Sequence, residues 1–129
     1  MSELIVYIDS SEILEGRLGE VKSAIDELVE FVDENEPRLI SYGFFFNEEG
    51  TRMTVIALHP DSASLELHME VGGPRFRRLR GMIRLSTIDV FGEVEESALE
   101  RLHEKARMLG SGTVTVHKLH AGFTRLVVA

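Results

Sequence analysis

Residues 59–68 read HPDSASLELH and decide how the first half of the chain folds. The stretch closes an apolar run from Thr51 to His59, which is typical of a strand, and then turns through a proline that disfavours helix in the residue before it. Asp61 or Ser62 can cap a helix, and we expect this helix to continue to about Val71. The segment therefore predicts a strand, a corner and a capped helix, with one histidine at each end.

On either side of this segment, stretches with the apolar spacing of a strand alternate with stretches that have the apolar spacing of a helix. We expect Gly72-Gly73-Pro74 to stop the helix, because both residue types disfavour helix interiors. The other expected elements are a strand at 4–8 ended by Asp9-Ser10-Ser11, a helix at 14–32 ended by Pro37, strands at 38–46 and 51–59 joined through Asn47–Gly50, a turn at 75–80, a strand at 82–91, a helix at 95–109, a strand at 113–119 and a short strand or docked tail at 123–128.

This order predicts an α+β fold: a ferredoxin-like antiparallel sheet with helices on one face, followed by a C-terminal helix and strand. We expect a single domain over 1–129, with a core at 3–92 and an extension at 93–129. The strands are apolar on both faces; for example, Phe44 and Phe45 point to opposite sides. A second copy of the chain could cover the face without helices, which favours a homodimer. The alternative is that the extension covers that face within one chain.

Composition limits the class of partner. The 129 residues have a formal net charge of −8, 43% hydrophobic and 28% charged residues, and no cysteine. The negative charge argues against nucleic acid as the main partner. No apolar run approaches the length of a membrane helix, and the acidic N-terminus is unlike a signal peptide. The absence of cysteine excludes disulfides and Cys-ligated metals and fits a reducing compartment, so we expect a cytoplasmic location.

Several short motifs carry a family resemblance. They are Asn35-Glu36-Pro37, Tyr42, the segment 59–68, Gly73-Pro74-Arg75-Phe76 and Val90-Phe91-Gly92. On these the chain resembles the dimeric α+β barrel superfamily, and most closely its antibiotic-biosynthesis-monooxygenase-like (ABM) domain proteins. The resemblance spans about residues 4–92. The extra helix and strand after Gly92 depart from the minimal domain, and they could seal the cavity, extend a dimer contact or bind something.

The resemblance implies a pocket between the sheet and the short helices, sized for an aromatic molecule. Better-understood relatives oxidise phenols or quinols with molecular oxygen and without metal or flavin, whereas other relatives degrade haem. It thus implies a cofactor-independent monooxygenase-like enzyme acting on a small aromatic or quinol-type molecule. The alternative is a non-catalytic small-molecule-binding or structural protein with the same dimeric fold, and the sequence leaves both readings open.

Three residues are candidates for the chemistry. His68 could accept a phenolic proton as a neutral imidazole, or be a helix histidine bonded to backbone or water. Tyr42 could donate its hydroxyl to a substrate carbonyl, or be a core aromatic. His59 could orient the substrate, or be a structural histidine at the strand end. The candidate substrate-binding residues are Phe44, Ser64, Met69, Arg75 and Phe76.

Two further patterns in the sequence bear on ligand binding. His117 and His120 are too far out of phase on a strand to chelate one metal, and no metalloprotease or facial-triad spacing is present, so we expect no metal site and no cofactor. The cluster Arg75, Arg77, Arg78, Arg80 and Arg84 could clamp an anion at the cavity mouth. It could equally be a surface paired with acidic residues of a neighbouring helix.

Overall fold

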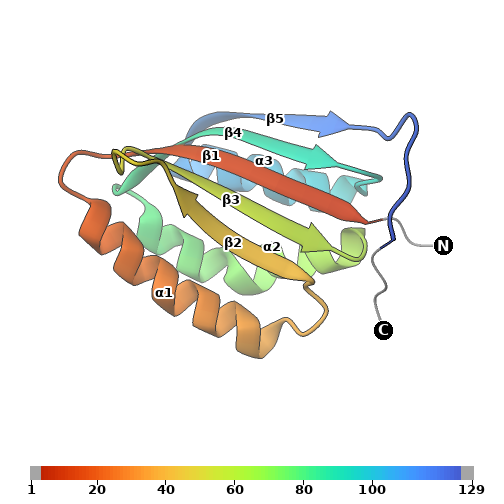
Figure 1. The fold of residues 1–129 in the computed structure, drawn as a ribbon, viewed down its shortest axis with the longest axis horizontal. Helices are drawn as coiled ribbons and strands as arrows, with labels where there is room; N and C mark the ends of the chain where they lie inside the picture. Colours follow the sequence, from red (N-terminus) through yellow and green to blue (C-terminus); the bar gives the residue numbers. More distant parts are fainter. Residues whose placement is uncertain (1–3, 126–129) are drawn as a thin grey trace.

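Helices lie on one face of a five-stranded sheet in the computed structural model, which describes residues 4–125 apart from the side chain of Ser111 (Figure 1). In chain order the elements are β1 (Ile5–Ile13), α1 (Leu18–Asn35), β2 (Ser41–Phe46), β3 (Arg52–His59), α2 (Ser62–Phe76), a 3-10 turn (Arg77–Leu79), β4 (Ile83–Phe91), α3 (Glu96–Leu109) and β5 (Gly110–His117). The predicted α+β class and the predicted element order are confirmed.

The strand order is β2-β3-β1-β4-β5. The first four strands pair antiparallel in the ferredoxin-like arrangement, with Tyr7 of β1 opposite Ala57 of β3 and Val90 of β4. β5 instead runs parallel to β4, which is possible because α3 carries the chain back along the sheet. The predicted extension therefore belongs to the same sheet as the rest.

The core lies between the sheet and the helices. Residues alternate along β1 and β3, so that every second side chain faces the helices and is buried. The buried apolar side chains of the strands are Ile5, Tyr7, Ile13, Met53, Val55, Ala57, Ile83, Leu85, Ile88 and Val90. They pack against apolar stripes of the helices, for example Leu28 of α1, Leu65 of α2 and Leu102 of α3.

β1 is longer than predicted. We expected Asp9-Ser10-Ser11 to end it, but the strand continues to Ile13, with a bulge between Ser10 and Ser11. Asp9 and Ser11 keep the period of Ile5 and Tyr7 and lie buried on the helix side. Burying a carboxylate is unfavourable unless it is hydrogen-bonded, and here Asp9 accepts hydrogen bonds from Tyr7 and Lys105 inside the protein.

α2 also differs from the prediction, because it runs through Gly72-Gly73-Pro74 to Phe76. Tertiary packing outweighs the weak helix propensity of this triplet. Phe76 is almost fully buried, and its ring lies against Gly72 so closely that a Cβ on Gly72 would be 2.7 Å from the ring. The glycine therefore makes room for an aromatic ring one turn further along the helix.

After β5 the described chain turns away from the β5 edge and runs across the end of the sheet (Figure 1). The sequence leaves open a short strand or a docked tail at 123–128; residues 123–125 form no strand, and residues 126–129 lie outside the described residues. Within residues 4–125, no helix combines the length and the apolar character needed to cross a membrane.

Candidate functional site

A small cavity lies between the sheet and the helices. It measures about 10 Å³, roughly the space of one water molecule. Its wall is mostly apolar but includes four polar groups, and the residues that line it are Asp9, Ser11, Leu28, Tyr42, Phe44, Met53, Val55, Phe76, Leu79, Ile83, Leu85, Lys105 and Leu109. Two of the predicted substrate-binding residues, Phe44 and Phe76, are therefore in the wall, together with Tyr42.

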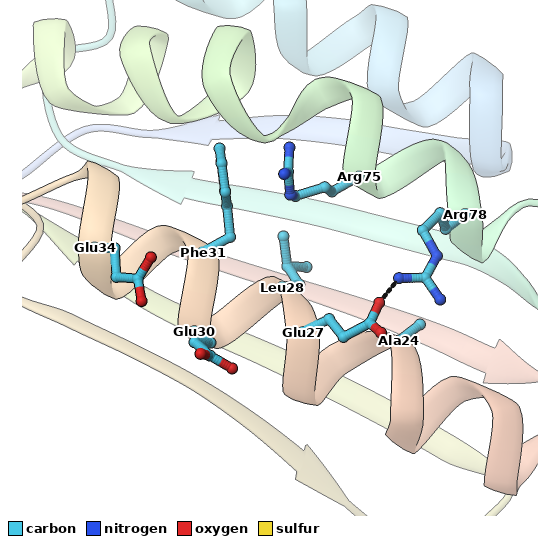
Figure 2. Close-up of a pocket in the computed structure, with 8 residues that line it drawn as sticks. All are labelled: Ala24, Glu27, Leu28, Glu30, Phe31, Glu34, Arg75 and Arg78. Carbon is cyan, nitrogen blue, oxygen red and sulfur yellow. Dashed lines mark hydrogen bonds and ion pairs between the residues drawn. The ribbon is translucent and has the colours of Figure 1, made fainter.

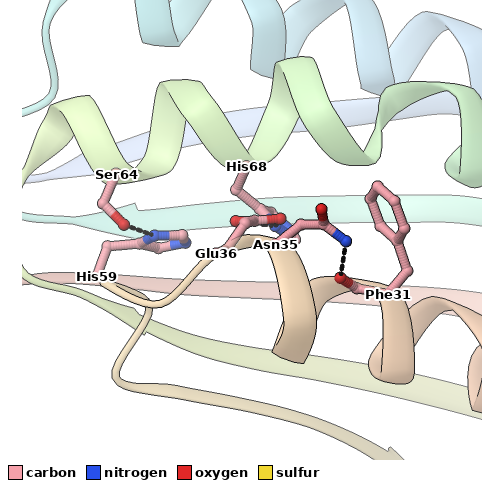
Figure 3. A network of polar contacts seen from close by, with 6 residues as sticks. All are labelled: Phe31, Asn35, Glu36, His59, Ser64 and His68. Carbon is pink, nitrogen blue, oxygen red and sulfur yellow. Dashed lines mark hydrogen bonds and ion pairs between the residues drawn. The ribbon is translucent and has the colours of Figure 1, made fainter.

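His68 forms a buried pair with a carboxylate. Its Nδ1 lies 2.9 Å from both carboxylate oxygens of Glu36, and both residues are nearly inaccessible to solvent (Figure 3). Because a carboxylate can only accept, Nδ1 carries the proton and the lone pair is on Nε2. Burial lowers the pKa of His68, although Glu36 opposes this effect. The imidazole is thus neutral near pH 7 and oriented by its partner.

Glu36 reaches this position because α1 ends at Asn35. Its backbone N–H donates to the carbonyl of Val32, and the next residue is Pro37, which cannot continue the helix ladder. The chain therefore turns toward the sheet and carries the Glu36 side chain under α2. In the sequence, Asn35-Glu36-Pro37 stands out only as a family motif, and no local pattern predicts that Glu36 binds His68.

His59 is the second buried histidine. Its Nδ1 lies 2.9 Å from the hydroxyl oxygen of Ser64, one turn into α2 (Figure 3). Burial lowers the pKa of His59 to about 3, and the nearby His68 adds to the effect. The two imidazole centroids are 5.6 Å apart. Asp61 caps α2 by accepting from the backbone N–H of Ser64, so the helix start and the His59 contact form one joint.

Aromatic rings surround His68. The ring of Tyr42 meets it edge-on at a centroid distance of 5.0 Å, and the ring of Phe76 lies at 5.3 Å. Tyr42 also packs edge-on against Phe44 at 5.0 Å. Burial, with the charges of Asp9 and Glu36, raises the pKa of Tyr42 well above its usual value, so its hydroxyl stays protonated. The sequence candidates His68, Tyr42 and His59 thus lie together.

A second polar group was missed by sequence analysis. Tyr7 donates to Asp9 Oδ2 at 2.5 Å, and Lys105 Nζ lies 2.8 Å from the Tyr7 hydroxyl and 3.1 Å from Asp9 Oδ2. The signal was present: Tyr7, Asp9 and Ser11 share one face of a strand by period 2, and Lys105 stands beside the apolar stripe of its helix. Because the sequence predicts that the first strand ends at Asp9, the shared face of these three residues is not evident from the sequence.

The remaining predicted residues lie elsewhere. Ser64 is engaged by His59, and Met69 is buried in the core without lining the cavity. Arg75 lies in a separate groove of about 390 Å³ between α1 and α2, with its guanidinium 3.3 Å from the centre of the Phe31 ring (Figure 2).

Two other arginines of the basic cluster form ion pairs. Arg78 pairs with Glu27 on α1, and Arg84 with Glu12 on β1. These contacts are those of a paired surface rather than an anion clamp. Within residues 4–125, no group of three or more His, Asp or Glu side chains is placed to hold a metal ion.

No protein-family model matches the sequence, and no curated protein matches it. Solved structures do match. MupZ from Pseudomonas fluorescens superposes with a TM-score of 0.75 at 21% identity, covering 99% of this chain and 100% of that one. A putative antibiotic biosynthesis monooxygenase from Caulobacter crescentus gives a TM-score of 0.64 at 16% identity, covering 73% and 92%.

SnoaB, a cofactor-independent oxygenase from Streptomyces nogalater, gives a TM-score of 0.60 at 13% identity over 73% of this chain and 96% of its own. The fold is that of the ABM-like proteins. Two of these neighbours match about three quarters of this chain, whereas MupZ matches nearly all of it, so the additional length is shared with MupZ.

Proposed function

We propose that the chain is a cofactor-independent monooxygenase-like enzyme that acts on a small aromatic or quinol-type molecule. The observation that carries the proposal is the buried Glu36–His68 pair, which lies against the rings of Tyr42 and Phe76. A carboxylate that orients a neutral imidazole is an arrangement suited to a general base. The shared fold with SnoaB supports oxygenase activity by analogy only, because proteins of one fold can have different functions.

In the proposed reaction, His68 Nε2 accepts a proton from a phenol or from the methylene of an anthrone. The substrate anion then supplies the electrons that reduce molecular oxygen. For an anthrone, the methylene becomes a carbonyl, and the second oxygen atom leaves as water, so that no external reductant is needed. Tyr42 would donate its hydroxyl to the substrate carbonyl, and His59 would hold the start of α2 through Ser64.

Substrate entry requires the cavity to open. A space of about 10 Å³ holds one water molecule and no aromatic ring. One specific observation therefore favours the second candidate function, a non-catalytic protein that keeps the fold: Phe44 and Phe76 fill the space that a substrate would need. The two functions differ in whether the cavity admits a ligand and whether oxygen is then consumed.

We also propose a homodimer in which two sheets meet face to face. Val6, Ile8 and Ile56 alternate with buried positions and so point to the face that the helices leave uncovered. Phe45 on the same sheet is 57% exposed, and Phe91 is 37% exposed. An apolar surface of this kind is expected to be covered by a partner, and a second copy offers the matching surface.

Oxygen uptake tests the enzyme proposal. A panel of quinols and anthrones is incubated with the wild type, with H68A, with E36Q and with H103A as a matched control, since His103 is an exposed histidine on α3. We expect uptake by the wild type and H103A, a loss of at least about a hundredfold in H68A, and a smaller loss in E36Q. Uptake that H68A leaves unchanged would remove His68 from the mechanism. Ligand binding without any uptake would favour the non-catalytic function.

A further inference from the structure

The Asp9–Lys105 pair is largely shielded from solvent, and both residues line the small cavity. The Lys105 side chain is 9% exposed and that of Asp9 is 3% exposed. Burying two charges costs more than their attraction returns unless the geometry is good, so such a pair often has a role beyond stability. Lys105 also belongs to the segment after Gly92, for which the sequence suggested no definite role.

Donors remain free around this pair. An ammonium has three N–H groups, and Lys105 uses two of them on the Tyr7 hydroxyl and Asp9 Oδ2. Ser11, on the same strand face, is fully buried, and its hydroxyl has no hydrogen-bond partner among the described residues. Ser11 and Lys105 both line the cavity. Two unused donor groups therefore border the same small space.

The apolar side of that space is aromatic. Lys105 Nζ lies 4.3 Å from the centre of the Phe76 ring, and the same ring lies beside His68. The rings of Phe76 and Tyr42 both lie in the cavity wall beside Lys105 and both contact the His68 ring, so they connect the two polar groups. A ligand that contacts His68 from this interior would bring its far end toward Lys105.

We propose that Lys105 and Ser11 bind an anionic oxygen of an aromatic ligand, such as a carboxylate, phenolate or enolate. The proposal rests on the proposed function only in taking the same cavity as the ligand site. Lys105 would supply a positive charge and its third N–H, and Ser11 would donate its hydroxyl to the same oxygen. The rings of Tyr42 and Phe76 would form the apolar walls of the site. Asp9 and Tyr7 would be positioning residues that hold the ammonium in place.

Equilibrium binding of two matched compounds tests this inference. 2-Naphthoate carries the anion, and 2-acetylnaphthalene is a neutral ketone of similar shape; both are titrated calorimetrically at pH 7.5. We expect the wild type to bind the naphthoate at least about tenfold more tightly than the ketone. In the double variant D9N/K105M, which leaves no buried charge unpaired, the naphthoate should lose that advantage while ketone binding changes less than about twofold.

Two single variants complete the test. S11A removes a hydroxyl that no described residue uses, so we expect unchanged thermal stability and about threefold weaker naphthoate binding. K118M is the matched control at an exposed lysine and should bind like the wild type. Equal losses for both compounds in D9N/K105M, or no naphthoate binding by the wild type, would overturn the inference. H68A should keep the preference for naphthoate, so failure of the proposed oxygenase and failure of this anion site give different results.

Discussion

His59 and His68 are the residues whose protonation most directly opposes folding. In the unfolded chain each binds a proton below its ordinary pKa of 6.5, whereas burial lowers the folded-state pKa of both, that of His59 to about 3. Well above pH 6.5 both histidines are neutral in the folded and in the unfolded chain, so they do not lower the free energy of unfolding. As the pH falls below 6.5 the unfolded state takes up protons that the folded state refuses, so the free energy of unfolding decreases.

We therefore predict that His59 contributes a loss that approaches about 1.4 kcal/mol per pH unit as the pH falls from 6.5 toward 5, and that His68 adds a loss in the same direction. Urea unfolding at a series of pH values measures the slope. H59Q should reduce the slope by one histidine's share, whereas H103Q, at an exposed histidine, should leave it as in the wild type. An unchanged slope in H59Q would contradict a neutral, buried His59.

At the scale of the element, the two adjacent glycines of α2 should respond differently to alanine. A Cβ on Gly73 meets nothing within 4 Å beyond its chain neighbours, so the gain in helix propensity in G73A is opposed only by Pro74, which disfavours helix in a preceding residue that carries a Cβ. We predict that these two effects largely cancel, so that G73A changes the free energy of unfolding by less than about 1 kcal/mol. Thermal and urea unfolding measure the change.

G72A is the matched variant in the same helix. Its Cβ would be 2.7 Å from the buried ring of Phe76, and this ring cannot move without disturbing the cavity wall. We predict destabilisation of about 1–3 kcal/mol by overpacking. Equal effects of G72A and G73A would show that the ring of Phe76 adapts freely, and hence that the cavity opens more easily than its packing suggests.

The C-terminal helix α3 is the other element with a direct test. Leu102 is fully buried against the sheet, whereas Leu119, after β5, is 66% exposed. We predict that L102A lowers the free energy of unfolding by about 2–5 kcal/mol and that L119A changes it by less than about 0.5 kcal/mol. Urea unfolding compares the two. A small effect of L102A would mean that α3 is not part of the core.

At the scale of the whole molecule, the uncovered sheet face predicts the oligomeric state. We expect the wild type to sediment as a dimer and I56D to sediment as a monomer, because a carboxylate on β3 would be buried without a partner in the contact. V29D is the control, since Val29 is 37% exposed on α1, on the side of the helices. It should remain a dimer. A monomeric wild type would contradict the proposed arrangement.

Much of the fold followed from local patterns. The order of helices and strands, the amphipathic stripe of α3 and the capped start of α2 each depend on residues within a few positions of one another, which a period or a cap can reveal. The two errors arose where distant contacts compensate a locally unfavourable residue. β1 continues through Asp9 because Lys105 pairs with its carboxylate. α2 continues through Gly72-Gly73-Pro74 because the ring of Phe76 packs against Gly72.

The sequence by itself determined the fold class, the histidines at the two ends of HPDSASLELH and the absence of cysteine chemistry. Only the tertiary structure decided which groups face one another, because their separations along the chain exceed any local pattern. Glu36 and His68 are 32 residues apart, and Asp9 and Lys105 are 96 apart. Sheet pairing and helix packing bring both pairs into one interior. There, away from water, the interactions of each charge and each unused donor are stronger than they would be on the surface.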